Sequence, residues 1–192
     1  WYKSDYNKKS ITEVHFVTDY DGEYTECWQG GIDDTNNITV YRLNGILYIS
    51  SNGAPKIRLS KSCCEMFYNW EKLTVVDGFE MVDSSMVTDF SYMFSMDVRI
   101  TNETAQSFLN NMDFSNCKTV KELFRNGGYI YTLTIPATCD FSKITDFSGV
   151  FESCYSLKEV IFEEGVSFPN VTTIYMLYDG CQVIREVDLS MF

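Results

Sequence analysis

The sequence predicts an α/β repeat protein: a right-handed solenoid of leucine-rich repeats with short parallel strands and short helices, preceded by a small β-rich N-terminal cap. Three observations predict this fold class. A block that ends in an aromatic residue recurs with a period of about 27 residues, a strand-like pattern follows the later blocks at a constant offset, and two β-rich runs around a tight turn precede them all. Repeats of this length bury their apolar faces by stacking on one another.

The repeated block has apolar residues at its positions 1, 4, 7 and 8. Its closing aromatics are 30, 27 and 27 residues apart in the clearest copies, and a less regular copy ends at Phe67, 27 residues before the first of them. This spacing places the apolar residues on one face of a short helix. A threonine near the start, followed by aspartate in two copies, is typical of a capped helix N-terminus. We therefore expect a helix of about two turns in each block. The clearest copies are 87–94, 117–124, 144–151 and 171–178.

A Leu-x-x-Leu-x-Leu pattern follows the last three blocks, and its copies start at Ile130, Leu157 and Ile184. It predicts a short strand whose alternate residues point into a core. An earlier copy begins at Leu73 and breaks at Gly78. The repeat between the first two clear blocks is longer by three residues, and its segment 99–109 has no clean strand pattern. We expect that insertion to lie in a loop on one face.

The first 58 residues do not carry the repeat. The runs 38–43 and 46–49 flank Asn44 and Gly45, the dipeptide that favours a type I′ hairpin. A small β-rich unit here would cover the open core face of the first repeat. We therefore divide the chain into a β-rich N-terminal cap with a hairpin at 1–58 and about five repeats at 59–192.

The composition excludes several classes of partner. The chain has 27 acidic and 15 basic residues and a formal net charge of -12, which disfavours nucleic acid and anionic membranes. No run approaches the roughly 18 apolar residues of a membrane-spanning helix, so we expect no membrane insertion. The sequence starts at Trp1 without a charged-then-apolar leader, so we expect any export signal to lie outside it.

Residues that support catalysis or cofactor binding are sparse. His15 is the one histidine and lies on a predicted strand without an accompanying serine or cysteine motif. We interpret it as a strand residue with its hydrogen bonds satisfied or exposed to water. The acidic turn around Asp19, Asp21 and Glu23 contains part of a calcium loop but lacks the full spacing. The sequence therefore predicts neither an enzyme nor a metal or cofactor site.

Four of the seven cysteines lie at repeat positions. Cys63 and Cys117 replace apolar residues of a block, and Cys154 and Cys181 each follow a closing aromatic by three residues. Thiols at such positions behave as small buried hydrophobes. We favour this interpretation over disulfides or a metal site, because the cysteine count is odd and no Cys-x-x-Cys pair is present.

The candidate binding residues lie on the strand face that points away from the core, which is the common binding surface of stacked repeats. The alternative is a face that is merely solvated. A paired-carboxylate hydrolase that uses Glu159 and Glu186 is a third reading, but nothing else completes such a site. The predicted end of the stack exposes core and a strand edge, and is a candidate surface for self-association. The candidate binding residues are Asp77, Thr132, Thr134, Glu159, Ile161, Glu186 and Asp188.

The stretches 87–94 and 140–157 closely resemble the repeats of the BspA-like leucine-rich repeat surface proteins. Those repeats run through an Asn-Val-Thr-Asp-Met-Ser-Gly-Met-Phe-like core and a Gly-Cys-Ser-Ser-Leu-like turn. The resemblance covers residues from about 60 to 192 and departs from the pattern at 117–120. It implies a bacterial extracellular or cell-wall-associated protein, and for some members attachment to host matrix proteins or to other bacteria. It carries over no catalytic residues.

We therefore expect a non-enzymatic, adhesin-like module that binds a protein or glycan on host or bacterial surfaces. The alternative is a structural spacer or stalk of a longer wall-attached protein, with no ligand of its own. A binding module should present a contiguous patch of exposed aromatic or apolar groups rimmed by polar ones, whereas a spacer should not.

Overall fold

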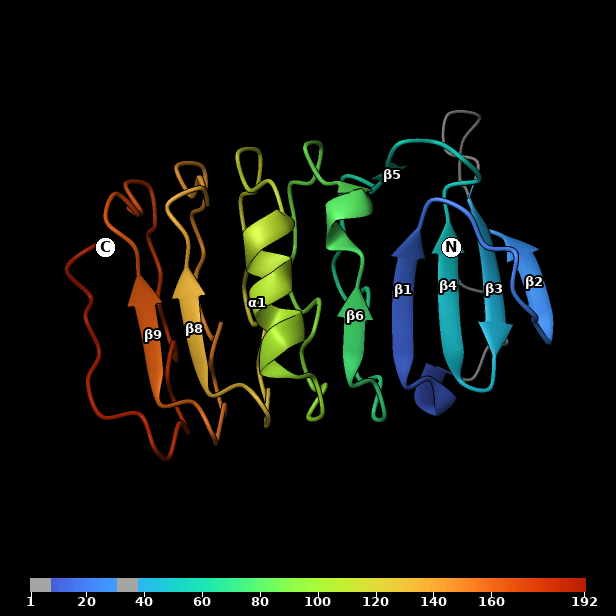
Figure 1. Cartoon of the computed structure of the whole chain (residues 1–192). Coiled ribbons are helices and arrows are strands. Elements are labelled where there is room, and N and C mark those ends of the chain that lie inside the picture. The colour runs from blue at the N-terminus through green and yellow to red at the C-terminus, as the bar shows by residue number, and fades with distance from the viewer. Residues whose placement is uncertain (1–7, 31–37) are drawn as a thin grey trace.

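The computed structural model describes residues 8–30 and 38–192. Its largest sheet has five strands in the order β2-β3-β4-β1-β6, and two small parallel sheets pair β5 with β7 and β8 with β9 (Figure 1). The strands of the large sheet are β1 (Glu13–Val17), β2 (Glu26–Gln29), β3 (Thr39–Leu43), β4 (Ile46–Ser50) and β6 (Val75–Asp77). The small sheets contain β5 (Ile57–Arg58), β7 (Val82–Asp83), β8 (Thr132–Ile135) and β9 (Glu159–Phe162). The helices are α1 (Asn102–Asn111) and the 3-10 helices η1 (Lys8–Ser10) and η2 (Phe79–Met81).

The predicted fold class, a right-handed solenoid of leucine-rich repeats, is wrong. The described residues form one mixed five-stranded sheet, two small sheets and one α-helix, and the repeat strands do not join into one continuous parallel sheet. Two features account for the difference. The first repeat strand, β6, pairs with β1 of the N-terminal segment. Helix α1 then lies between β6 and β8 (Figure 1), and it includes most of the segment 99–109, which was expected to lie in a loop.

The predicted hairpin is confirmed. Strands β3 and β4 pair in antiparallel fashion, and the turn between them has φ of 49° at Asn44 and 87° at Gly45. Positive φ at both central residues is what a type I′ turn requires. Strand β1 lies between β4 and β6 and runs parallel to both. The predicted N-terminal cap therefore shares a sheet with the first repeat. Residues 1–7 and 31–37 of the predicted cap lie outside the described part of the chain.

The blocks that were predicted as short helices are pairs of tight turns. Each pair of turns has two residues in the left-handed region, one inside the block and one two residues after its closing aromatic, as at Tyr92 (φ 58°) and Met96 (φ 66°). Left-handed residues interrupt a right-handed helix. The corresponding pairs are Glu65 and Asn69, Glu122 and Asn126, Gly149 and Ser153, and Met176 and Gly180.

Neighbouring blocks are joined by backbone hydrogen bonds. Amides of alternate residues donate to the carbonyls of the following block, as the Phe94 amide does to Leu123 O at 3.0 Å, while most of the amides between them close turns inside the block. The threonines that were predicted as helix caps also join blocks, since Thr145 Oγ1 donates to Lys118 O at 3.3 Å. The repeat period therefore sets the spacing of a hydrogen-bonded stack of turns.

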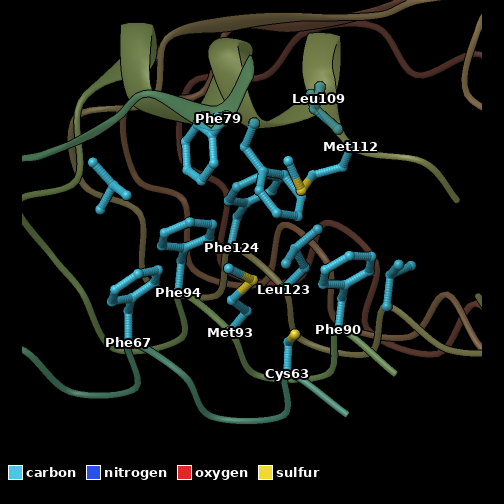
Figure 2. Close-up of a cluster of buried hydrophobic side chains, with 14 of the residues drawn as sticks. Cys63, Phe67, Phe79, Phe90, Met93, Phe94, Leu109, Met112, Leu123 and Phe124 are labelled. Carbon is cyan, nitrogen blue, oxygen red and sulfur yellow. The ribbon is translucent and has the colours of Figure 1, made fainter. Parts of the chain in front are cut away.

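The closing aromatics form a column inside this stack. The ring centroids of Phe67 and Phe94 are 5.4 Å apart, and those of Phe94 and Phe124 are 5.8 Å apart, with the rings nearly parallel. Figure 2 shows these three rings in one row. Phe151 and Tyr178 continue the column at 6.2 and 5.5 Å. The apolar face that the repeat pattern predicted thus forms a large part of the core, together with residues of the N-terminal strands.

The interpretation of the repeat cysteines as buried hydrophobes is confirmed at Cys63, Cys117 and Cys154, which are buried and free. Cys181 is half-buried and also free. Burial raises the pKa of the Cys63 and Cys117 thiols to about 12. These thiols therefore stay protonated at neutral pH and are poor nucleophiles.

Candidate binding surface

The predicted binding face is divided by helix α1. Thr132 and Thr134 lie on β8, directly opposite Glu159 and Ile161 on β9. Asp77 lies on β6, on the other side of α1 (Figure 1). The seven predicted residues therefore do not share one surface, and the β8–β9 end of the molecule holds most of them.

Side chains of α1 occupy the inner edge of β8. Gln106 Nε2 donates to Thr134 O at 2.8 Å, and Gln106 Oε1 accepts from the Thr134 amide at 2.8 Å. Asn102 Oδ1 accepts from the Thr132 amide at 3.1 Å. A side-chain amide thus replaces a neighbouring strand at this edge. Thr132 and Thr134 are half-buried, so the exposed part of the predicted surface lies on β9 and beyond.

A surface hollow of about 750 Å³ lies between β9 and the segment that follows the last block. Glu159, Glu186 and Asp188 line it, so the structure brings together three predicted residues from distant positions in the chain. The other lining residues are Lys158, Val160, Val183 and Arg185.

The strand that was predicted to start at Ile184 does not form. The segment 183–188 has no regular secondary structure, and β9 pairs only with β8 within the described residues. The chain end is instead anchored elsewhere, because the Phe192 ring stacks on Phe168 with centroids 4.3 Å apart and the Phe168 amide donates to Met191 O. The outer edge of β9 is therefore unpaired beside the hollow.

The hollow carries more negative than positive charge. Its three carboxylates outnumber the two cations, Lys158 and Arg185. The pKa of Asp188 is lowered because the Ser190 amide donates to its carboxylate at 2.8 Å. Asp188 is consequently ionised at neutral pH, and the local charge has the same sign as the net charge of the whole chain.

Exposed tyrosines lie on the loops that lead into β8 and β9. Tyr129, Tyr131 and Tyr155 are 51%, 43% and 46% exposed. Tyr131 lies beside the hollow, because Tyr131 O accepts from the Lys158 amide and the Lys158 ammonium lies 5.9 Å from the centroid of the Tyr131 ring. Val183, which lines the hollow, is 43% exposed. Sequence reasoning missed this aromatic edge; its signal was Tyr129 and Tyr155, which lie one and two residues before the strand patterns that start at Ile130 and Leu157.

His15 and Asp77 belong to a separate polar cluster on the large sheet. His15 Nδ1 lies 2.7 Å from Asp77 Oδ1, and His15 Nε2 lies 3.1 Å from Glu13 Oε2. The His15 ring also stacks on Tyr48, with centroids 5.2 Å apart. The interpretation of His15 as a strand histidine with satisfied hydrogen bonds is confirmed, and Asp77 is one of its partners.

Within residues 8–30 and 38–192, no three His, Cys, Asp or Glu side chains gather closely enough to hold a metal ion. The same residues include no helix that is long and apolar enough to cross a membrane.

Comparison with protein-family models, with curated proteins and with solved structures gave no match to this chain.

Proposed function

We propose that this chain is a non-enzymatic interaction module of an extracellular or cell-wall-associated bacterial protein. It binds proteins or glycans on host or bacterial surfaces through the hollow beside β9 and the tyrosines next to it. The observation that carries the proposal is the continuity of these two features at Lys158, which lines the hollow and contacts Tyr131. An exposed aromatic edge that borders a polar hollow is typical of a binding surface.

The resemblance of the repeat sequences to BspA-like surface proteins supports the extracellular assignment and the adhesin-like role. The aromatic edge favours a binding role over the alternative of a spacer, since a spacer gains nothing from exposing tyrosines at one end. Tyrosine contributes a large rigid contact area and a hydroxyl that can bond a partner.

The experiment that tests the proposal measures binding of the purified chain to an array of extracellular-matrix proteins and glycans. We expect saturable binding to one class. The triple variant Glu159→Ala, Glu186→Ala, Asp188→Ala should bind at least about tenfold more weakly, because it removes charges that border the contact. The matched control removes three exposed carboxylates elsewhere, Glu23→Ala, Glu80→Ala and Glu103→Ala.

The control variant has the same net charge as the triple variant, so a general charge effect would weaken both equally. Equal affinities of the two variants would contradict a binding role for the hollow. Absence of binding by the unmodified chain to every member of the array would favour the spacer.

A further inference from the structure

The outer edge of β9 presents backbone groups that no strand of the described residues satisfies. Strand backbones direct their amides to alternate sides. The Glu163 amide donates to Ile135 O on β8, and Leu133 lies opposite Val160. By this alternation, the backbone groups of Val160 and Phe162 face away from β8, toward the hollow.

We infer that this edge binds an extended, basic peptide segment of a partner protein as an added strand. The inference rests on the proposed function and specifies its partner. Main-chain hydrogen bonds to an open strand edge provide affinity in this mode of recognition, and side-chain pockets provide specificity. The hollow of about 750 Å³ lies where the added strand would pass.

Charge selects the occupant. Glu159, Glu186 and Asp188 line the hollow, so basic side chains on alternate positions of the added strand meet carboxylates. A second copy of this chain is less suitable, because it would bring the same carboxylates and another net charge of -12 to the interface. The half-buried Val160 offers an apolar contact between the charged groups.

The test uses the whole chain and a synthetic probe, the capped heptapeptide Thr-Lys-Val-Lys-Val-Lys-Thr. Two matched peptides separate the contributions: one has glutamate for each lysine, and the other has N-methyl groups on its central residues. We expect the glutamate peptide to bind at least about tenfold more weakly, because its charges are repelled. The N-methylated peptide should also lose at least about tenfold, because it cannot donate to the strand edge.

Amide exchange locates the probe. Saturation with the lysine peptide should slow exchange of the Val160 amide at least about tenfold, since a new strand protects it. The Glu163 amide already bonds Ile135 O and should change little. The variant Val160→Pro removes an outward amide and should abolish binding, whereas Val160→Ile keeps the amide and should bind normally. Should the proline variant fail to fold, the N-methylated peptide gives the same test.

Equal affinity of the N-methylated and unmodified peptides would overturn strand addition. So would a dimer in sedimentation that already protects the Val160 amide, because a second copy would then hold the edge. Array binding that depends on Glu159, Glu186 and Asp188 without any peptide binding would overturn only the strand-addition inference. Peptide binding with a silent array would support strand addition and count against the broader surface role.

Discussion

The carboxyl of Asp97 is an unusual side chain in the buried stack. It is fully buried, its Oδ1 accepts from the Trp70 amide, and its Oδ2 has no hydrogen-bond partner among the described residues. Burial raises its pKa to about 9. The equivalent positions of two later repeats carry Cys154 and Cys181, whose thiols donate to the carbonyls of the closing aromatics one repeat earlier, Phe124 and Phe151. A carboxyl there leaves a buried polar atom unsatisfied.

We expect the repeat-derived substitution Asp97→Cys to stabilise the protein. A thiol fits the position in the later repeats, and the Trp70 amide keeps its bond to Phe67 O at 3.3 Å. The free energy of unfolding at pH 7.5 should rise by about 1–3 kcal/mol, because an unsatisfied buried polar group is removed. Urea unfolding followed by circular dichroism measures this. A lower stability of the variant would contradict the account.

The same carboxyl predicts a pH dependence. The folded pKa of about 9 lies above the ordinary aspartate value of 3.8. Between these values the unfolded chain has released the proton and the folded chain keeps it, so the free energy of unfolding falls as pH rises. In the Asp97→Cys variant the free energy of unfolding should fall less steeply between pH 5 and pH 8. Unfolding at several pH values measures this dependence. Parallel profiles for the two proteins would exclude Asp97 as the source.

Gly78 and Gly165 distinguish two energetic costs of adding a Cβ, namely backbone strain at positive φ and a steric clash with neighbouring atoms. Both have positive φ, 75° and 98°, but a Cβ at Gly78 would lie 2.1 Å from Phe16 O, whereas a Cβ at Gly165 would meet no atom within 4 Å. Gly165→Ala should cost about 1 kcal/mol of backbone strain. Gly78→Ala should cost about 3 kcal/mol or more, since the backbone must also move. Urea unfolding of the two variants checks this, and equal costs would contradict the close approach.

At the scale of elements, α1 acts as a substitute for a strand. Gln106 bonds both the amide and the carbonyl of Thr134, and on the opposite side the Thr104 hydroxyl accepts from the Val76 amide of β6 at 3.2 Å. The helix thereby satisfies backbone groups of the two sheets between which it lies. Its buried Phe108 ring meets Phe94 edge-on at 5.3 Å, which fixes the helix against the aromatic column.

We expect Gln106→Ala to weaken this link. Loss of the two bonds to Thr134 should lower the free energy of unfolding by about 1–3 kcal/mol and speed exchange of the Thr134 amide. The control Asn111→Ala removes an exposed side chain whose bond stays inside the helix, to Ser107 O. Calorimetry and amide exchange measure both effects. If the two variants behaved alike, the strand-mimicking role of Gln106 would be refuted.

The sequence pattern was sufficient to predict the buried repeat residues and the hairpin, but it did not predict the backbone conformation of the blocks. The period placed the closing aromatics in one column because stacking is set by repeat length. It could not reveal the turns, because left-handed φ occurs at Tyr92 and Glu122, and neither residue type indicates it. A capped short helix and a turn whose threonine bonds the neighbouring block require the same residue types. The pattern therefore cannot distinguish the two structures.

The prediction of the fold class was wrong for reasons that lie outside the repeat pattern itself. Pairing of β6 with β1 depends on a contact distant in sequence. Helix α1 had a weak local signal, a Thr101 cap followed by buried Ala105, Phe108 and Leu109. The hollow beside β9 brings together three of the predicted carboxylates. It lies where the strand expected at Ile184 does not form, and no local sequence pattern predicts that absence.

Across the whole molecule, burial declines toward the last block. The closing aromatics Phe67, Phe94, Phe124 and Phe151 are 0% exposed, whereas the last block buries only Leu177 and leaves Tyr175 70% exposed. Elements with few buried contacts open at lower free energy than the core, and binding sites commonly draw on such elements. The proposed binding surface lies at this end of the stack.

Amide exchange in the native state should therefore show a gradient along the stack. The Phe94 and Phe151 amides make equivalent bonds, to Leu123 O at 3.0 Å and Leu177 O at 3.1 Å, and both side chains are buried. The two hydrogen bonds differ in the block that contains the acceptor, which is an inner block for the Phe94 amide and the last block for the Phe151 amide. Because the last block has little buried surface to hold it, we expect the Phe151 amide to exchange at least about tenfold faster than the Phe94 amide. Equal protection would mean that the stack opens only as one unit, and that the end beside β9 is as stable as the centre.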